Sequence, residues 1–133
     1  NGEKFYINSH YQAVKSQIKT LVKRSKISNK QKLSGSIASP GNISGTARVV
    51  LTINDFQHFK EGEILVASMI RPELTPVILK AKGIITDEGG ITSHASIIAR
   101  EFNKPCIVGT KIATKIIKNG NIVELSEGRV ILK

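Results

Sequence analysis

Glycine and proline divide the chain beyond residue 32 into short runs of β-branched and aliphatic residues, and this pattern restricts the possible folds more than any other feature. Such runs predict strands, whereas segments with apolar residues at steps of three and four predict helices. Many short strands with two or three helices are typical of a mixed α/β layered fold. The predicted strands are 36–38, 45–51, 63–67, 82–86, 106–108, 120–125 and 129–132, and the predicted helical segments are 54–59, 72–81 and 94–102.

The first 32 residues differ from the rest of the chain in charge. They hold eight Lys or Arg against the single acid Glu3 and so account for +7 of the net charge of +10. Within them, residues 9–24 predict a helix with an apolar stripe, and residues 25–32 predict a linker. The sequence therefore indicates a basic helix and linker over 1–32, interpreted as the end of a preceding domain, and a globular domain over 33–133.

Two interpretations of the basic helix stay open. It could be an arm for nucleic acid or acidic lipid. It could also be a connector whose apolar stripe packs on a neighbouring domain and whose lysines are solvated. The helix has no interleaved aromatic residues beyond Tyr11, so we favour the connector and expect no nucleic-acid partner.

Length and composition exclude several other classes of protein. With 133 residues and one cysteine, the chain cannot form an internal disulfide or a cysteine-based zinc cluster. No apolar run approaches the roughly 20 residues of a membrane span, and the first residues do not resemble a signal peptide. We therefore expect a cytoplasmic protein without a membrane partner. Because the sequence begins at Asn1 and not at methionine, we also expect a piece of a larger protein.

One segment, 86–100, combines residues that indicate chemistry. It reads TDEGGITSHASIIAR and predicts a strand, a tight turn on Gly89 and Gly90, and a helix that starts near Thr92 or Ser93. Glycines allow positive φ and close backbone approach at such a turn. Ala95, Ile98, Ala99 and Phe102 follow at helical spacing, so we expect that face to pack inward.

His94 falls in the first turn of this predicted helix. The positive end of the helix dipole disfavours a protonated imidazolium, which leaves a nitrogen lone pair available for attack. The same end stabilises an anion, because helix N-termini bind phosphate groups. These properties suit phosphoryl transfer through histidine. The hydroxyls of Thr92 and Ser93 could cap the helix and donate to phosphate oxygens. A capping or surface role for His94 is the alternative that spacing alone leaves open.

The segment GGITSHASIIAREFNKPCIVGT, 89–110, closely resembles the phosphohistidine signature of the phosphoenolpyruvate-utilising enzymes, the family of pyruvate phosphate dikinase and phosphoenolpyruvate synthase. The resemblance continues through LSGSIASPGNISGTARVV, GEILVASMIRPELTP, AKGIITDEGG and GNIVELSEGRVIL. It therefore spans about 33–133, which is nearly the whole predicted globular part.

The resemblance implies an α/β fold, namely a swivelling β/β/α sandwich that serves as a mobile phosphohistidine domain. His94 matches the histidine that accepts a phosphoryl group at an ATP or phosphoenolpyruvate site and passes it to a second site. Gly89, Gly90, Thr92 and Ser93 are then expected to stabilise the phosphoryl group. Thr92 also matches a position that some dikinases phosphorylate for regulation.

The resemblance further implies partners and cofactors outside this chain. The ATP-binding and acceptor domains of a parent chain would be the partners, with pyruvate/phosphoenolpyruvate-type chemistry favoured over water, an antibiotic hydroxyl or a glucan as acceptor. Mg²⁺ and ATP are expected in the parent enzyme, whereas this domain is expected to bind no cofactor and no metal. The alternatives are a basic nucleic-acid-binding module and an inactive scaffold domain.

The remaining candidate residues carry weaker expectations. We expect Cys106 to be a buried thiol in a strand, and His10 and His58 to be isolated. Asp87 and Glu88 are expected to shape the turn before Gly89. Arg100 lies six residues after His94, so a surface salt bridge and a phosphate contact are equally compatible with its position.

Overall fold

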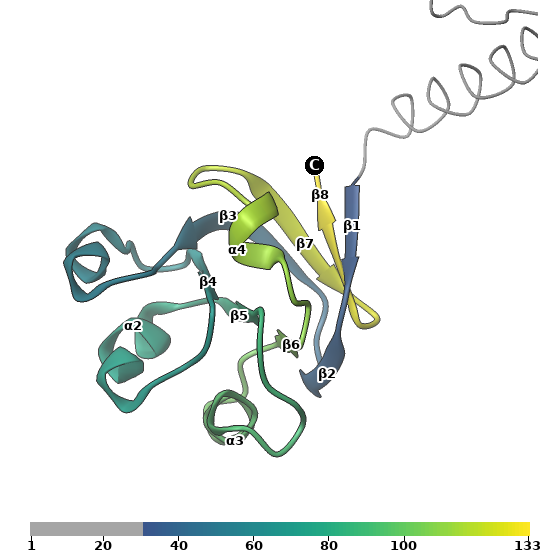
Figure 1. The fold of residues 1–133 in the computed structure, drawn as a ribbon, viewed down its shortest axis with the longest axis horizontal. Helices are drawn as coiled ribbons and strands as arrows, with labels where there is room; N and C mark the ends of the chain where they lie inside the picture. The colour runs from purple at the N-terminus through teal and green to yellow at the C-terminus, as the bar shows by residue number, and fades with distance from the viewer. Residues whose placement is uncertain (1–30) are drawn as a thin grey trace, which may run out of the picture. The chain divides into compact units, whose positions relative to one another are not determined.

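The computed structural model describes residues 31–133, so the predicted helix over 9–24, most of the predicted linker and His10 lie outside the described residues. The described part is a mixed α/β domain with eight strands and short helices (Figure 1). In chain order its elements are β1 (Gln31–Ser34), β2 (Ser36–Ser39), β3 (Ile43–Val49), η1 (Ile53–His58), β4 (Ile64–Ala67), η2 (Pro72–Leu74), α2 (Thr75–Lys80), β5 (Gly83–Thr86), α3 (His94–Glu101), β6 (Cys106–Val108), α4 (Ala113–Ile116), β7 (Ile122–Ser126) and β8 (Arg129–Leu132).

The strands form one strongly curved sheet in the order β1-β8-β7-β3-β4-β5-β6-β2. Strands β3 to β6 run parallel, and the remaining pairs are antiparallel. The two outermost strands, β1 and β2, are consecutive in the chain and are separated only by Gly35. A Cβ on Gly35 would lie 2.5 Å from the carbonyl oxygen of Val108. The absence of a side chain there lets the link between β1 and β2 lie against β6. Because this one-residue link joins the two outermost strands, the sheet nearly closes on itself.

The parallel strands separate two cores because their side chains alternate between the two faces. In β4, Ile64 and Val66 belong to a core shared with β1, β7, β8 and α4, whereas Leu65 and Ala67 belong to a core shared with α2 and α3. All four side chains are almost completely buried. Figure 1 shows α2 and α3 on one side of β4–β6, and β7 and β8 on the other. This arrangement confirms the predicted β/β/α sandwich.

The structure differs from the sequence-based elements at three places. β1 and α4 were not predicted, and the segment predicted as one helix over 72–81 divides into the 3-10 turn η2 and the helix α2. Pro76 explains the division, because it has no N–H to continue a helix from η2 but fits the first turn of α2. β1 begins at Gln31, two residues before the predicted start of the globular domain. The division of the chain into 1–32 and 33–133 stays a prediction. No helix among residues 31–133 is long and apolar enough to cross a membrane.

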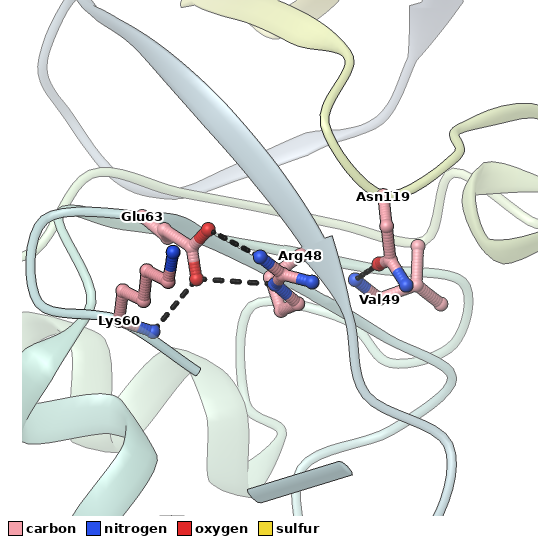
Figure 2. A network of polar contacts seen from close by, with 5 residues as sticks. All are labelled: Arg48, Val49, Lys60, Glu63 and Asn119. Carbon is pink, nitrogen blue, oxygen red and sulfur yellow. Dashed lines mark hydrogen bonds and ion pairs between the residues drawn. The ribbon is translucent and has the colours of Figure 1, made fainter. Parts of the chain in front are cut away.

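A partly buried polar network links Arg48 of β3 to Glu63, the residue before β4 (Figure 2). The Arg48 guanidinium donates from Nε and from Nη2 to the two carboxylate oxygens of Glu63, at 3.2 and 3.0 Å. The backbone N–H of Lys60 donates to the same carboxylate at 2.7 Å. Burial opposes ionisation of Glu63, but these hydrogen bonds outweigh it and hold the pKa of Glu63 below its ordinary value of 4.5.

We expect the Glu63→Gln variant to lower the free energy of unfolding by about 1–2 kcal/mol at pH 7, because charge-assisted hydrogen bonds to a buried group are lost. Since the pKa of Glu63 is lower in the folded than in the unfolded chain, its contribution is complete above pH 4.5 and disappears as the pH falls through the folded value. Urea unfolding at pH 7 and at pH 3 measures this. If the variant and the wild type differ in free energy of unfolding by the same amount at both pH values, the prediction is contradicted.

Candidate functional site

The segment between β5 and α3 is anchored from both sides at the carboxyl ends of the parallel strands. The backbone N–H of Asp87 donates to the carbonyl of Ala67 at 3.1 Å, and the N–H of Lys111 donates to the carbonyl of Asp87 at 2.8 Å. Thr110 adds its hydroxyl, which donates to the carbonyl of Thr86 at 2.9 Å. Both threonines are buried. The turn therefore starts from a rigid base at the edge of the sheet.

Asp87 and Glu88 shape this turn, as predicted. One carboxylate oxygen of Asp87 accepts the backbone N–H of Thr114 at 2.9 Å, and the other accepts the Thr114 hydroxyl. A carboxylate oxygen of Glu88 accepts the hydroxyl of Ser68 at 3.1 Å. These carboxylates are engaged by protein donors, and residues 31–133 hold no group of three or more His, Cys, Asp or Glu side chains that could bind a metal ion.

The two glycines of the turn have different roles. Gly89 has a φ of +100°, and a Cβ there would lie 3.0 Å from the Ser93 hydroxyl oxygen. Gly90 has no positive φ, and nothing lies within 4 Å of the Cβ position. The expectation that both glycines provide unusual backbone conformation is therefore correct for Gly89 and wrong for Gly90. Gly90 contributes through its carbonyl, which accepts the Ser93 N–H at 3.0 Å.

We expect Gly89→Ala to lower the free energy of unfolding by about 1–3 kcal/mol, because the variant combines a strained φ with a contact against the Ser93 side chain. Gly90→Ala is the matched control and should change it by less than about 0.5 kcal/mol. Thermal and urea denaturation of both variants test this pair. Equal destabilisation by the two substitutions would show that the described turn geometry is wrong.

The helix α3 starts at His94 with Ser93 as its N-cap. The Ser93 hydroxyl oxygen accepts the backbone N–H of Ser96 at 3.3 Å, which confirms a capping role for one of the two predicted hydroxyls. Thr92 and His94 are exposed. Among the described residues, the structure gives no acceptor for the first-turn N–H groups of His94 and Ala95. An exposed imidazole thus lies beside N–H donors that no protein group uses.

The inward face of α3 agrees with the spacing except at its end. Ala95 and Ala99 are buried and Ile98 packs against the same core, but Phe102 is 36% exposed. Phe102 lies beyond the last helical residue, with φ −99° and ψ 9°, so the helical spacing no longer determines its direction. Ser96 is fully buried and was missed by the sequence analysis. Ser96 lies three residues after the cap and between the inward-facing Ala95 and Ala99 in the sequence, and this position could have predicted its burial.

A surface depression lies beside the turn at the carboxyl ends of β4, β5 and β6. Two cationic side chains, Lys111 and Lys115, line it together with Gly89. Lys111 has a φ of +76°, which its backbone hydrogen bond to the carbonyl of Asp87 helps to hold. The carboxylates of Asp87 and Glu88 line the same depression, so its positive and negative side chains balance in number. The other lining residues are Ser36, Ser68, Asp87, Glu88 and Gly109.

The remaining candidates lie away from His94. Cys106 is completely buried, as predicted, and burial raises the pKa of its thiol to about 12. His58 is an exposed residue of η1. The Arg100 guanidinium donates to the carbonyl of Ala38 in β2 at 3.0 Å. Arg100 therefore holds α3 to the sheet, and among residues 31–133 it forms no salt bridge. A phosphate contact of Arg100 stays a prediction.

Comparison with known proteins identifies the family. The model of the family described as "PEP-utilising enzyme, mobile domain" matches residues 59–128, more than half of the chain. The chain belongs to this family of mobile domains. The mobile domain is 45% identical over 97 residues to the phosphoenolpyruvate synthase of Pyrococcus furiosus, a match that covers 73% of this chain and 12% of that protein. It is 42% identical over 96 residues to the phosphoenolpyruvate synthase of Aeropyrum pernix, covering 71% and 12%.

These curated relatives are much longer than the mobile domain, which spans about an eighth of their length. Among solved structures, the mobile domain is similar to aconitase X of Thermococcus kodakaraensis in its holo-form, with a TM-score of 0.54 and 19% identity. That match covers 77% of this chain and 98% of the other. The likeness concerns the fold alone.

Proposed function

We propose that this domain carries a phosphoryl group on His94 between two sites of a larger phosphotransferase. The observation that carries the proposal is the exposed imidazole at the start of α3, beside first-turn N–H groups without a protein acceptor. A helix start stabilises an anion delivered to it. The turn that precedes the helix is fixed by backbone hydrogen bonds to the ends of β4 and β6, so these donors are already in place before the reaction.

The proposed chemistry moves a phosphoryl group from a donor oxygen to an imidazole nitrogen of His94 and then to an acceptor oxygen. The imidazole nitrogen lone pair forms a bond to phosphorus, and the bond from phosphorus to the donor's leaving group breaks. In the second half of the cycle an acceptor oxygen displaces the imidazole. His94 returns to its first state, and the exposure of the side chain is required at both sites.

Membership of the family supports phosphoenolpyruvate/pyruvate-type chemistry, since relatives with that synthase name share over 40% identity with this chain. We infer that ATP or phosphoenolpyruvate is the donor and that separate domains bind donor and acceptor. A nucleotide-bound Mg²⁺ would neutralise phosphate charge at the donor site. The described residues do not fit a Mg²⁺ site of their own, because they hold no group of three or more His, Cys, Asp or Glu side chains that could bind it. The isolated domain is therefore expected not to complete turnover.

Thr92 keeps two proposed roles. Its side chain is exposed two residues before His94, where a hydroxyl can donate to a phosphoryl oxygen. The same exposure makes it accessible to a regulatory kinase. Neither role requires a change in the fold.

Phosphorylation of the 133-residue chain tests the proposal. Phosphoramidate transfers its phosphoryl group to a neutral imidazole and releases ammonia, so it replaces the missing donor domain. We expect a phosphoprotein that loses phosphate in acid and keeps it in base, because protonation turns the imidazole into a good leaving group. A label that survives acid and is lost in base would indicate an ester and would overturn the proposal.

A further inference from the structure

The hydroxyl of Ser96 lies in a buried cluster directly beneath the start of α3. Ser96 is 0% exposed, and its hydroxyl oxygen lies 2.6 Å from the carbonyl oxygen of Gly90 and 3.1 Å from the Ser93 hydroxyl oxygen. Ser96 can be buried there because its hydroxyl and its backbone N–H both have hydrogen-bond partners. Its backbone N–H is taken by the oxygen of Ser93.

The number of protons in this cluster fixes the direction of each hydrogen bond. The Gly90 carbonyl can only accept, so the single hydroxyl proton of Ser96 must be donated to it. The contact between the two serine hydroxyls then requires the Ser93 proton, which Ser93 donates inward to Ser96. The Ser93 proton is therefore not available to an external phosphoryl group, in contrast to the role expected for it from the sequence.

The same cluster determines what the turn presents outward. The Gly90 carbonyl accepts from both the Ser96 hydroxyl and the Ser93 N–H, so its partial negative charge is held inside the turn. The groups left at the surface are the first-turn N–H donors, the Thr92 hydroxyl and the His94 imidazole. A negatively charged phosphoryl group at the helix start therefore meets hydrogen-bond donors, and the Gly90 carbonyl does not point at it.

We propose that Ser96 is a positioning residue for phosphoryl transfer through His94. Its hydroxyl holds the Gly90 carbonyl and the Ser93 proton inward, so that the start of α3 is arranged for an anion before the donor arrives. This inference rests on the proposed function of His94. It assigns the outward hydroxyl to Thr92 alone, and it makes Ser93 the helix cap and a donor to Ser96.

The test compares two histidines of one chain. Phosphoramidate is the probe, with the zwitterion H₃N⁺–PO₃²⁻ losing ammonia as the imidazole nitrogen bonds to phosphorus. The measured quantity is the initial labelling rate of His94 divided by that of His58, an exposed histidine on η1. Each variant is labelled under conditions where its circular dichroism matches that of the wild type, so that a lower ratio reports a misplaced turn and not unfolding.

In Ser96→Ala we expect the ratio to fall about fivefold, the scale of one lost buried hydrogen bond. Ser96→Thr keeps the hydroxyl and should retain most of the wild-type ratio. Ser93→Ala should lower the ratio less than Ser96→Ala, because Ser96 still holds the Gly90 carbonyl. Asn119→Ala is the matched control, since it removes an acceptor 2.6 Å from the Val49 N–H, far from α3 in the chain, and should leave the ratio unchanged.

The outcomes separate the two proposals. If His94 of the wild type reacts no faster than His58, the proposed function fails, and the inference about Ser96 fails with it. If the wild type shows the preference and Ser96→Ala retains it, only the role of Ser96 is overturned. A larger loss in Ser93→Ala than in Ser96→Ala would show that the ratio depends on the Ser93 hydroxyl more than on the hold of Ser96 on the Gly90 carbonyl, which also overturns the inference.

Discussion

Replacing His94 with glutamine is expected to abolish formation of an acid-labile phosphoprotein by the enzyme that contains this domain, with ATP or phosphoenolpyruvate as the donor. The amide nitrogen of glutamine has no available lone pair, so the variant keeps a polar side chain but lacks a nucleophile. The fold should be unaffected because His94 is exposed at the start of α3 and outside both cores. Retention of label and the circular dichroism of the variant are the measurements.

Two further variants make this result specific. His94→Ala and His94→Asn should be equally inactive, because they too remove the nucleophile. Thr92→Val keeps the nucleophile and should reduce labelling only about fivefold, the scale of one lost hydroxyl hydrogen bond. Normal labelling in His94→Gln would exclude His94 as the carrier. Complete loss in Thr92→Val would instead indicate that Thr92 has a part in the chemistry beyond donation to the phosphoryl group.

The largest effect on stability is expected for Ile85→Ala. Ile85 is fully buried in the core between the parallel strands and the β7–β8 layer. Truncation removes apolar contacts and leaves a cavity in a rigid layer, so the free energy of unfolding should fall by about 3–4 kcal/mol. That is a large share of the ~5–15 kcal/mol that stabilises a typical domain. Urea unfolding monitored by circular dichroism measures the loss.

Ile91→Ala is the matched control for this truncation. Ile91 is 59% exposed in the turn before α3, and the same substitution there should change stability by less than about 0.5 kcal/mol. A loss below about 1 kcal/mol in Ile85→Ala would mean that the core between the parallel strands and β7–β8 is not packed as described.

The sequence predicted the layers of the fold because its strands are short and clearly bounded. The predicted strand 106–108 coincides with β6, and the predicted strand 129–132 coincides with β8. β1 was not predicted because Gln31–Ser34 is polar and exposed at three of four positions, so its strand character comes from pairing with β8. α4 is a single turn of four residues, too short for a helical period to be visible.

At the candidate site, the sequence predicted where His94 lies, but not which groups the serine hydroxyls donate to. His94 at the helix start follows from local spacing and from the serine that precedes it. The different conformations of Gly89 and Gly90 depend on which side of the turn faces Ser93, and a dipeptide of identical residues holds no such information. The burial of Ser96 and the contact of Arg100 with Ala38 arise from the packing of α3 against β2 and β6, which the sequence analysis did not place.

The position of the phosphate tests the central claim most directly. The 133-residue chain is treated briefly with phosphoramidate, digested at neutral or basic pH to preserve the phosphorus–nitrogen bond, and its peptides are analysed by mass spectrometry. The account predicts phosphate first and predominantly on His94, with an initial rate about tenfold or more above that of His10 or His58. Phosphate on His10 or His58 while His94 stays unlabelled would contradict it.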